Sequence, residues 1–259
     1  MVTGITRSFT MAFTMRSGSN AICGLLTGNG LGEPSEWFQY APDAGADETR
    51  LDAFARVVDQ HKAEDTFGSK MSHNHRARLD EWLRGAVPGY RRLDDVLPAH
   101  RWLWLIRKDK VLQAISLCRA ERSGSWALTG SGHAVSGAYE YDFFHVLSRL
   151  MMIQGGELAW ELCFHEQGIE PFVMIYEDFF LDAERQLGKL IEFLGGLPPG
   201  RTTLDMGQTF KVQRNETNYA LRQRFISDFS RLGEDSFAEE LTGPYQKWNR
   251  FFFEQQWRT

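Results

Sequence analysis

A short polar loop, Arg16-Ser17-Gly18-Ser19-Asn20, combines the groups that bind an anion. Ser17, Ser19 and Asn20 can donate hydrogen bonds through their side chains. Arg16 adds a fork of donors that fits phosphate oxygens, and Gly18 lets the backbone approach a ligand closely. The GxxxxGKS or GxxxxGKT pattern of nucleotide hydrolases is absent. The spacing alone fits an ordinary capped helix equally well, with Ser19 as the N-cap residue and Gly18 as a turn residue.

A second turn, after the apolar residues 102–106, carries a comparable set of groups. Arg107 ends the apolar stretch, and Ser116 follows about two turns along an expected helix. An arginine and a hydroxyl that converge there could hold a second phosphate group. The alternative is a solvated basic turn, with Ser116 bonded back to its own helix. Two separated anion sites would suit a nucleotide with phosphate at both ends of its nucleoside.

The tetrapeptide Arg-Ser-Gly-Ser occurs twice, at residues 16–19 and again at residues 122–125. The second copy follows an expected helix, so we predict Gly124 to be a C-cap glycine. The tetrapeptide by itself is therefore weak evidence for an anion site. The strand expected before the first copy, and the helix expected after it, carry the inference.

Three segments repeat the order strand, polar turn, helix, which is typical of an α/β fold with a parallel sheet covered on both faces. The expected strand and helix pairs are residues 5–13 and 19–27, 102–106 and 110–121, and 171–176 and 182–194, the last pair joined by a turn over 177–181. Residues 66–71 are a fourth expected strand, and two further helices are expected over 138–164, where Gly155-Gly156 allows a kink or break, and 219–231. No linker divides the chain, so we expect a single domain over residues 1–259. Ligands of such sheets bind at the carboxyl ends of the strands, where residues 16–20 fall.

The overall composition excludes several classes of partner. The chain of 259 residues has 29 basic and 34 acidic side chains, a formal net charge of −5, which disfavours binding to nucleic acids and membrane surfaces. Its three cysteines are scattered, as is typical of reduced thiols. We see no secretory signal pattern and no apolar run near the roughly 20 residues that span a bilayer. We therefore expect a cytoplasmic protein with no nucleic-acid partner and no transmembrane segment.

Two carboxylates, Glu33 and Glu36, lie three residues apart after the first expected helix. If a helix begins at Pro34, both lie at its start, where acids and proline are common for reasons unrelated to catalysis. The other reading is acid–base chemistry on a substrate. The residues alone leave the two readings equal.

The pair His73 and His75 has the spacing of metal ligands, but no third ligand is near it in the sequence. We therefore expect no metal. His133, in a Gly- and Ser-rich stretch over residues 122–137, is a second candidate for a general base.

In their order along the chain, these motifs resemble those of the bacterial trehalose 2-sulfotransferase family. The family's RSGS, GEPxEFFQY and RxDxxxQAxSxxRA segments are similar to residues 16–19, 32–40 and 107–120. Residues 67–71 look like its GGKLM strand, and residues 176–178 look like its YE segment. Gln213 resembles a late glutamine of the family. The resemblance covers most of the chain.

The resemblance implies a P-loop-type three-layer αβα sandwich with a central parallel sheet that binds 3′-phosphoadenosine 5′-phosphosulfate (PAPS). Residues 16–20 would hold the 5′-phosphosulfate. The residues implied for the 3′-phosphate and the rest of the cofactor are Arg107, Ser116 and Gln213. Glu36 would be the general base, with His133 as the alternative, and Arg16 together with Lys70 would stabilise charge on the leaving phosphate.

The resemblance implies an acceptor that is a small molecule or glycolipid with a sugar hydroxyl. The residues implied to line the acceptor site are Glu33, Glu36, Trp37 and Gln39. Met15, Asn20, Leu221 and the stretch over residues 122–137 depart from the family pattern. Because Met15 and the stretch over 122–137 bear on the acceptor, trehalose itself is not implied. The C-terminal aromatic residues, from Tyr245 to Trp257, are expected to pack on the sheet or on a partner subunit, and we expect a homodimer.

Two other classes of protein remain as alternatives. A P-loop nucleotide kinase is disfavoured because the loop lacks the usual lysine and because no clear Mg²⁺-binding aspartate follows an apolar strand. A non-catalytic nucleotide-binding module is the third possibility, and in it Glu36 would only be a helix-start acid.

Overall fold

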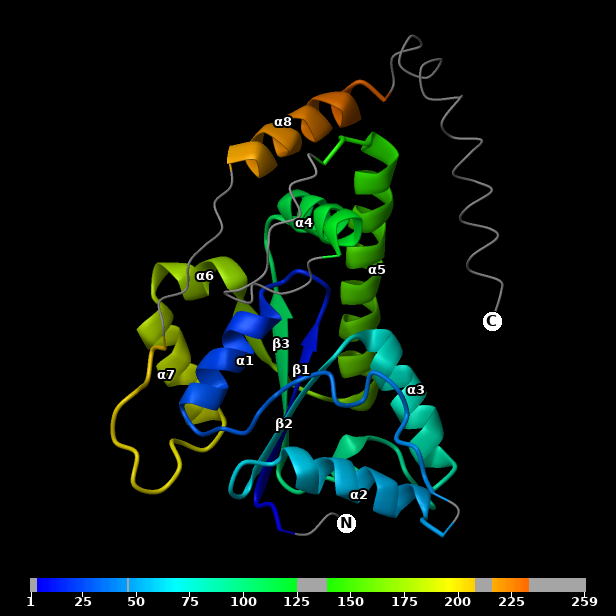
Figure 1. The fold of residues 1–259 in the computed structure, drawn as a ribbon, viewed down its shortest axis with the longest axis vertical. Helices are drawn as coiled ribbons and strands as arrows, with labels where there is room; N and C mark the ends of the chain where they lie inside the picture. Colours follow the sequence, from blue (N-terminus) through cyan, green and yellow to red (C-terminus); the bar gives the residue numbers. More distant parts are fainter. Residues whose placement is uncertain (1–3, 46, 125–138, 208–215, 233–259) are drawn as a thin grey trace. The chain divides into compact units, whose positions relative to one another are not determined.

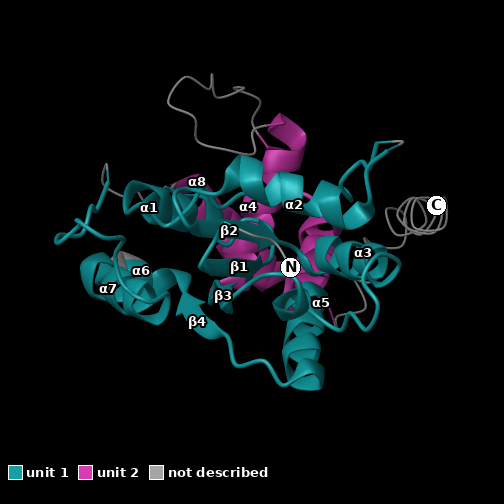
Figure 2. Cartoon of the chain, turned by 90° about the horizontal axis from the view of Figure 1, so that it is seen from below, with its two compact units in different colours: residues 1–108, 154–212 teal, residues 109–153, 213–259 magenta. Residues whose placement is uncertain are grey.

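The computed structural model describes residues 4–45, 47–124, 139–207 and 216–232. Two compact units make up the chain, residues 1–108 with 154–212 and residues 109–153 with 213–259 (Figure 2). We describe each unit by itself. That the whole chain acts as a single domain stays a prediction.

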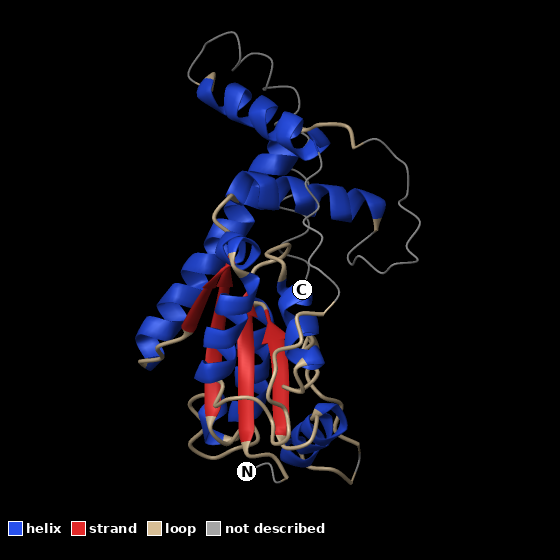
Figure 3. Cartoon of the chain, turned by 90° about the vertical axis from the view of Figure 1, so that its left-hand side faces the viewer, coloured by secondary structure: helices blue, strands red, loops and turns tan. Residues whose placement is uncertain are grey.

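The first unit is built on four parallel strands, which confirms the expected α/β fold with a central parallel sheet (Figure 3). The strands are β1 Arg7–Phe13, β2 Thr66–Met71, β3 His100–Ile106 and β4 Phe172–Ile175, in the order β2-β1-β3-β4. After its first residue β1 is buried throughout, because it has neighbours on both sides and helices on both faces. The carboxyl end of β1, where the polar loop begins, therefore lies in the middle of the sheet.

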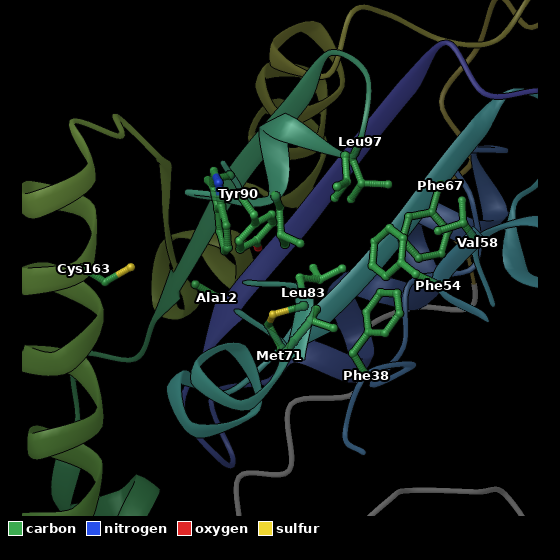
Figure 4. Close-up of a cluster of buried hydrophobic side chains, with 14 of the residues drawn as sticks. Ala12, Phe38, Phe54, Val58, Phe67, Met71, Leu83, Tyr90, Leu97 and Cys163 are labelled. Carbon is green, nitrogen blue, oxygen red and sulfur yellow. The ribbon is translucent and has the colours of Figure 1, made fainter. Parts of the chain in front are cut away.

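Helices cover both faces of this sheet, which gives three layers (Figure 1). On one face, apolar side chains of β1, β3 and β4 pack against α1 Ser19–Gly28, α6 Tyr176–Leu181 and α7 Ala183–Phe193. On the other face, α2 Arg50–His61, α3 His73–Arg84 and residues 154–167 of α5 pack on the strands, with the short turn η1 Leu93–Asp95 beside them. Figure 4 shows part of this second core, where Phe38, Phe54, Phe67 and Val58 meet.

The second unit is helical. It contains α4 Lys110–Ser123, residues 143–153 of α5 and α8 Glu216–Ser230, around a core of Ile115, Phe143 and Phe225. Asp109 caps α4 by accepting from the Leu112 amide at 2.9 Å, and its other oxygen accepts from Arg222 Nε of α8 at 2.8 Å. This shared carboxylate ties α8 to the start of α4.

Two of the expected element boundaries were wrong. Residues 177–181 are not a turn but most of α6, in which Glu177 and Asp178 occupy the first turn and favour the helix through its dipole. Gly155-Gly156 does not break the long helix, since α5 runs from Phe143 to Gln167. Gly124, by contrast, ends α4 in the left-handed conformation with φ 67°, which confirms it as a C-cap glycine.

His100, at the start of β3, keeps an unprotonated ring nitrogen in the protein interior. Its Nδ1 lies 2.9 Å from Ser8 Oγ, and the Ser8 hydroxyl donates to the Pro98 carbonyl at 2.9 Å. Because that hydroxyl has one proton, His100 must donate from Nδ1 and leave Nε2 bare. Nε2 is buried and finds no hydrogen-bond partner among the described residues. Burial therefore lowers the pKa of His100 to about 3.

Acid is expected to destabilise the fold through His100. The imidazole titrates near 6.5 in an unfolded chain and near 3 when folded, so the unfolded state binds the extra proton between these values. The contribution of neutral His100 to the free energy of unfolding is then fully present above pH 6.5. It falls as the pH falls toward 3, by up to about 1.4 kcal/mol per pH unit. Urea unfolding of the wild type and of His100→Asn from about pH 7 to pH 4 measures this slope. If the free energy of unfolding has the same pH dependence in the wild type and in His100→Asn, this prediction is contradicted.

Candidate active site

The polar loop turns sharply at the carboxyl end of β1. Arg16 and Gly18 both have positive φ, 63° and 93°, and α1 starts directly afterwards at Ser19. The N-cap residue of α1 is Gly18, so no side chain caps the amides of its first turn. Uncapped amides at the positive end of a helix dipole form a site for an anion. The structure thus confirms both elements predicted around the loop, the strand before it and the helix after it.

An aromatic ring fixes the conformation of the loop from outside. A Cβ atom on Gly18 would lie 2.4 Å from the ring carbons of Tyr176. Arg107 covers the same tyrosine, with its Cζ 4.9 Å from the ring centroid, and donates from Nη1 to the Arg16 carbonyl at 3.2 Å. Tyr176 and Arg107 therefore brace the loop, and only glycine fits at position 18 without displacing the ring.

The Ser17 hydroxyl is buried inside the loop. Ser17 is 0% exposed, and its Oγ forms no hydrogen bond within the part of the chain that the structure describes. A buried hydroxyl without a partner costs about 1–3 kcal/mol. Such a group next to a helix N-terminus is well suited to donate to a bound anion.

Two guanidinium groups lie close together at this loop. Burial lowers the pKa of Arg16, and repulsion from Arg107 lowers it further. An anion bound by these groups would relieve that repulsion, because it favours the charged form of both. The electrostatics of the site therefore favour a negatively charged ligand, in a chain whose net charge is −5.

Lys70 of β2 extends its buried side chain to the first turn of α1. Its Nζ donates to Asn20 Oδ1, lies 3.5 Å from Ser19 Oγ, and lies 5.1 Å from the centroid of the Phe13 ring. Lys70 is 6% exposed, so its amino group is held in place by these contacts. The structure thus brings Lys70, the cation predicted to act on the leaving phosphate, together with Ser19 and Asn20 of the polar loop over residues 16–20, which we call the anion loop.

Glu36 reaches Lys70 because residues 32–36 run alongside β2. Ser35 pairs with Ser69 in a parallel bridge, and its carbonyl accepts from the Lys70 amide at 2.8 Å. This places Glu36 Oε2 3.7 Å from Lys70 Nζ. No helix begins at Pro34, so the reading of Glu36 as a helix-start acid is wrong.

The other residues expected at the acceptor site lie along the same segment. Glu33 and Gln39 are exposed. Trp37 stacks on His61, with ring centroids 3.5 Å apart and planes 6° apart, and its Nε1 donates to the Glu33 carbonyl at 3.0 Å. One face of the indole is thus covered by His61, and a sugar would have to use the other face or the edge.

Three expected site residues are not placed with this group. Ser116 lies on α4 in the second unit, and Gln213 and His133 lie outside the described residues. Their roles stay predictions.

Two residues of the site were not expected as functional ones. Tyr176 was noted only as part of a family-like segment, and His75 only as one half of a metal pair. His75 Nδ1 lies 3.7 Å from Glu36 Oε1. Both residues follow the carboxyl end of a parallel strand, β4 for Tyr176 and β2 for His75. That position was the available signal, since such ends form the ligand-binding edge of a parallel sheet.

The residues that the structure describes offer neither a metal cluster nor a membrane-spanning helix. Across these residues, no three His, Cys, Asp or Glu side chains gather where they could hold a metal ion. His73 and His75 share the first turn of α3 without a third ligand in the described part of the chain. Of the helices in the described ranges, none has both the length and the apolar surface needed to cross a bilayer.

The comparison with protein families identifies the class of this chain. The family model of the Stf0 sulphotransferases matches residues 8–228, most of the chain. The protein is therefore a sulfotransferase, an enzyme that transfers sulfuryl groups. Within that class, the chain belongs to the Stf0 sulphotransferase family.

Solved structures and curated proteins add little to this assignment. The sulfotransferase domain of the olefin synthase from Synechococcus PCC 7002 is similar to this chain at 16% identity and a TM-score of 0.37. The match covers 86% of this chain and 95% of that domain. No curated protein matches the chain.

Proposed function

We propose that this enzyme transfers a sulfuryl group from PAPS to a hydroxyl of a carbohydrate or glycolipid, with Glu36 as the general base. The buried Ser17 hydroxyl carries the proposal, because it lies in an anion loop and has no hydrogen-bond partner in the described ranges. A phosphosulfate group offers acceptor oxygens to this hydroxyl and to the first turn of α1, which no side chain caps.

The residues present fit the donor. We propose that Arg16, Ser17 and the first-turn amides of α1 bind its 5′-phosphosulfate. A side chain at position 18 would disturb this loop, since its Cβ would lie 2.4 Å from the ring carbons of Tyr176. Arg107 and Ser116 are proposed to bind the 3′-phosphate, and Gln213 is proposed to bind another part of the donor.

When bound, PAPS supplies a sulfuryl group on a phosphate leaving group. Lys70, held by Asn20 and Ser19, is positioned to neutralise the charge that grows on that phosphate, and Arg16 shares the task. Phosphoryl-transfer enzymes use a divalent cation for much of this work. Here two side chains are proposed to supply the positive charge.

Glu36 is proposed to take the proton of the acceptor hydroxyl as its oxygen attacks sulfur. The carboxylate lies 3.7 Å from Lys70, which itself contacts the first turn of α1, so base and anion loop belong to one cluster. A positioned base typically contributes a factor of about 10² to 10⁴. Glu33, Trp37 and Gln39 are proposed to bind the acceptor near it.

Further parts of the proposal concern the setting of the enzyme. We propose that the acceptor is a small molecule or glycolipid, that the enzyme works in the cytoplasm, and that it is a homodimer. These statements rest on the resemblance of its motifs and on the composition of the chain.

Calorimetry with adenosine 3′,5′-bisphosphate tests the donor site. We expect tight binding that is unchanged when magnesium is removed, and much weaker binding of ATP, because the proposed site takes phosphate at both ends of a nucleoside. ATP bound more tightly than the bisphosphate, in a magnesium-dependent manner, would favour a nucleotide kinase and contradict the proposal.

A further inference from the structure

The carboxylate of Glu36 lies between two nitrogen atoms. Lys70 Nζ is 3.7 Å from Oε2, and His75 Nδ1 is 3.7 Å from Oε1. The lysine belongs to the cluster that contacts the anion loop. The histidine has no part in the function proposed above.

The β2–α3 connection explains why both nitrogens reach the same carboxylate. β2 ends at Met71, and α3 begins two residues later at His73. The Ser72 hydroxyl caps α3 by accepting from the His75 amide at 3.4 Å, which fixes His75 in the first turn. The imidazole and the Lys70 side chain are therefore presented to Glu36 from one continuous stretch of backbone.

The ring of His75 is poised for a hydrogen bond that this structure does not form. Its side chain is 15% exposed, and Nδ1 is buried without a hydrogen-bond partner in the described residues. The distance of 3.7 Å to Glu36 exceeds the upper limit of a good hydrogen bond, about 3.2 Å, by about 0.5 Å. A small rotation of the Glu36 side chain would close that gap.

The charges around His75 oppose its protonation on balance. Burial lowers its pKa, the Glu36 carboxylate raises it, and Arg78 on the next turn of α3 lowers it again. The N-terminal end of the α3 dipole also disfavours a cation in the first turn. The pKa of His75 therefore lies below its ordinary value, and the ring is neutral near pH 7.

We propose that His75 is a positioning residue for Glu36, and that it makes the base sensitive to pH. The inference rests on the proposed function, in which Glu36 takes the acceptor proton. Neutral His75 donates from Nδ1 to Oε1 and holds the carboxylate in place. Protonated His75 pairs with the carboxylate as a cation, and this weakens Glu36 as a base because the ion pair favours the charged carboxylate.

Two substitutions separate positioning from titration. His75→Asn keeps an N–H donor near the position of Nδ1 but does not titrate. We expect kcat near that of the wild type at about pH 7.5, with the acid limb of the kcat profile moved to lower pH. His75→Phe keeps the ring and loses the donor, and we expect kcat to fall about tenfold or more while donor affinity stays unchanged.

His73→Asn is the matched control. His73 also lies in the first turn of α3, burial also lowers its pKa, and its ring packs edge-on against Trp160 at 5.6 Å, not against Glu36. This variant should keep the acid limb of the wild type. The inference is overturned if His75→Asn keeps the wild-type limb, or if His75→Phe keeps full kcat.

NMR titration of the histidine ring signals decides the coupling without turnover. In Glu36→Gln, the pKa of His75 should fall further, because the carboxylate that raises it is gone. An unchanged His75 pKa would overturn the inference whether or not the enzyme is active. Failure of the proposed function would show separately, as absence of turnover with PAPS in the wild type.

Discussion

Gly18→Ala is expected to weaken the binding of adenosine 3′,5′-bisphosphate about a hundredfold or more. Position 18 has φ 93°, which L-residues rarely adopt, and a left-handed conformation costs them about 1–2 kcal/mol. The new methyl group would also lie 2.4 Å from the ring of Tyr176. Either the ring or the loop must move: a displaced ring no longer braces the loop, and a displaced loop carries the α1 amides and the Ser17 hydroxyl away from the ligand.

Gly124 offers a control within the same tetrapeptide. Gly124 follows the second Arg-Ser pair and has φ 67°. A Cβ atom at this position would have no neighbouring atom within 4 Å among the described residues. Gly124→Ala should therefore destabilise the fold by about 1 kcal/mol and leave the affinity for the bisphosphate unchanged. Calorimetry on both variants gives the comparison. Equal affinities for Gly18→Ala and the wild type would mean that the loop does not bind the donor.

Glu36→Gln is expected to lower kcat by about 10² to 10⁴ while the affinity for the bisphosphate changes little. The amide has the size of the carboxylate but cannot take up the acceptor proton. Lys70 keeps its contacts with Asn20 and Ser19, so the leaving-group side of the site should be preserved. Initial rates at saturating PAPS and calorimetry with the bisphosphate separate the two effects.

Glu81→Gln, an exposed substitution on α3, controls for the loss of one negative charge. It should behave as the wild type in both measurements. Full turnover by Glu36→Gln would remove Glu36 as the base, and His133 would then be the next residue to test.

The anion loop was predictable from the sequence because all of its parts are local. An apolar strand, a turn with Gly18 and a following helix occupy one short stretch, and the second Arg-Ser-Gly-Ser copy showed which context matters. The contact that makes Gly18 necessary was not predictable, since Tyr176 is the first residue of α6 and follows a different strand, β4. Spacing rules do not report such long-range contacts.

The conformation around Glu36 could not be predicted for a related reason. Proline followed by an acid favours a helix start locally, but Ser35 pairs with Ser69 of β2 in a parallel bridge and no helix forms at Pro34. Gly32 and Gly68 allow the close approach: a Cβ on Gly32 would lie 3.0 Å from the Gly68 nitrogen, and a Cβ on Gly68 would lie 3.1 Å from Pro34 Cβ. Tertiary pairing therefore overrides the local preference, and it also brings His75 to Glu36.

Transfer of a labelled sulfuryl group from PAPS is the most direct test of the proposed function. Purified enzyme, labelled PAPS and a library of sugar and glycolipid hydroxyl acceptors are incubated, and the labelled product is identified. We predict a labelled O-sulfate ester that requires wild-type enzyme and is lost at least about a hundredfold in Glu36→Gln. The absence of any labelled product across the library would contradict the proposed transfer. If the same enzyme still binds the bisphosphate in calorimetry, that result would favour a non-catalytic nucleotide-binding role.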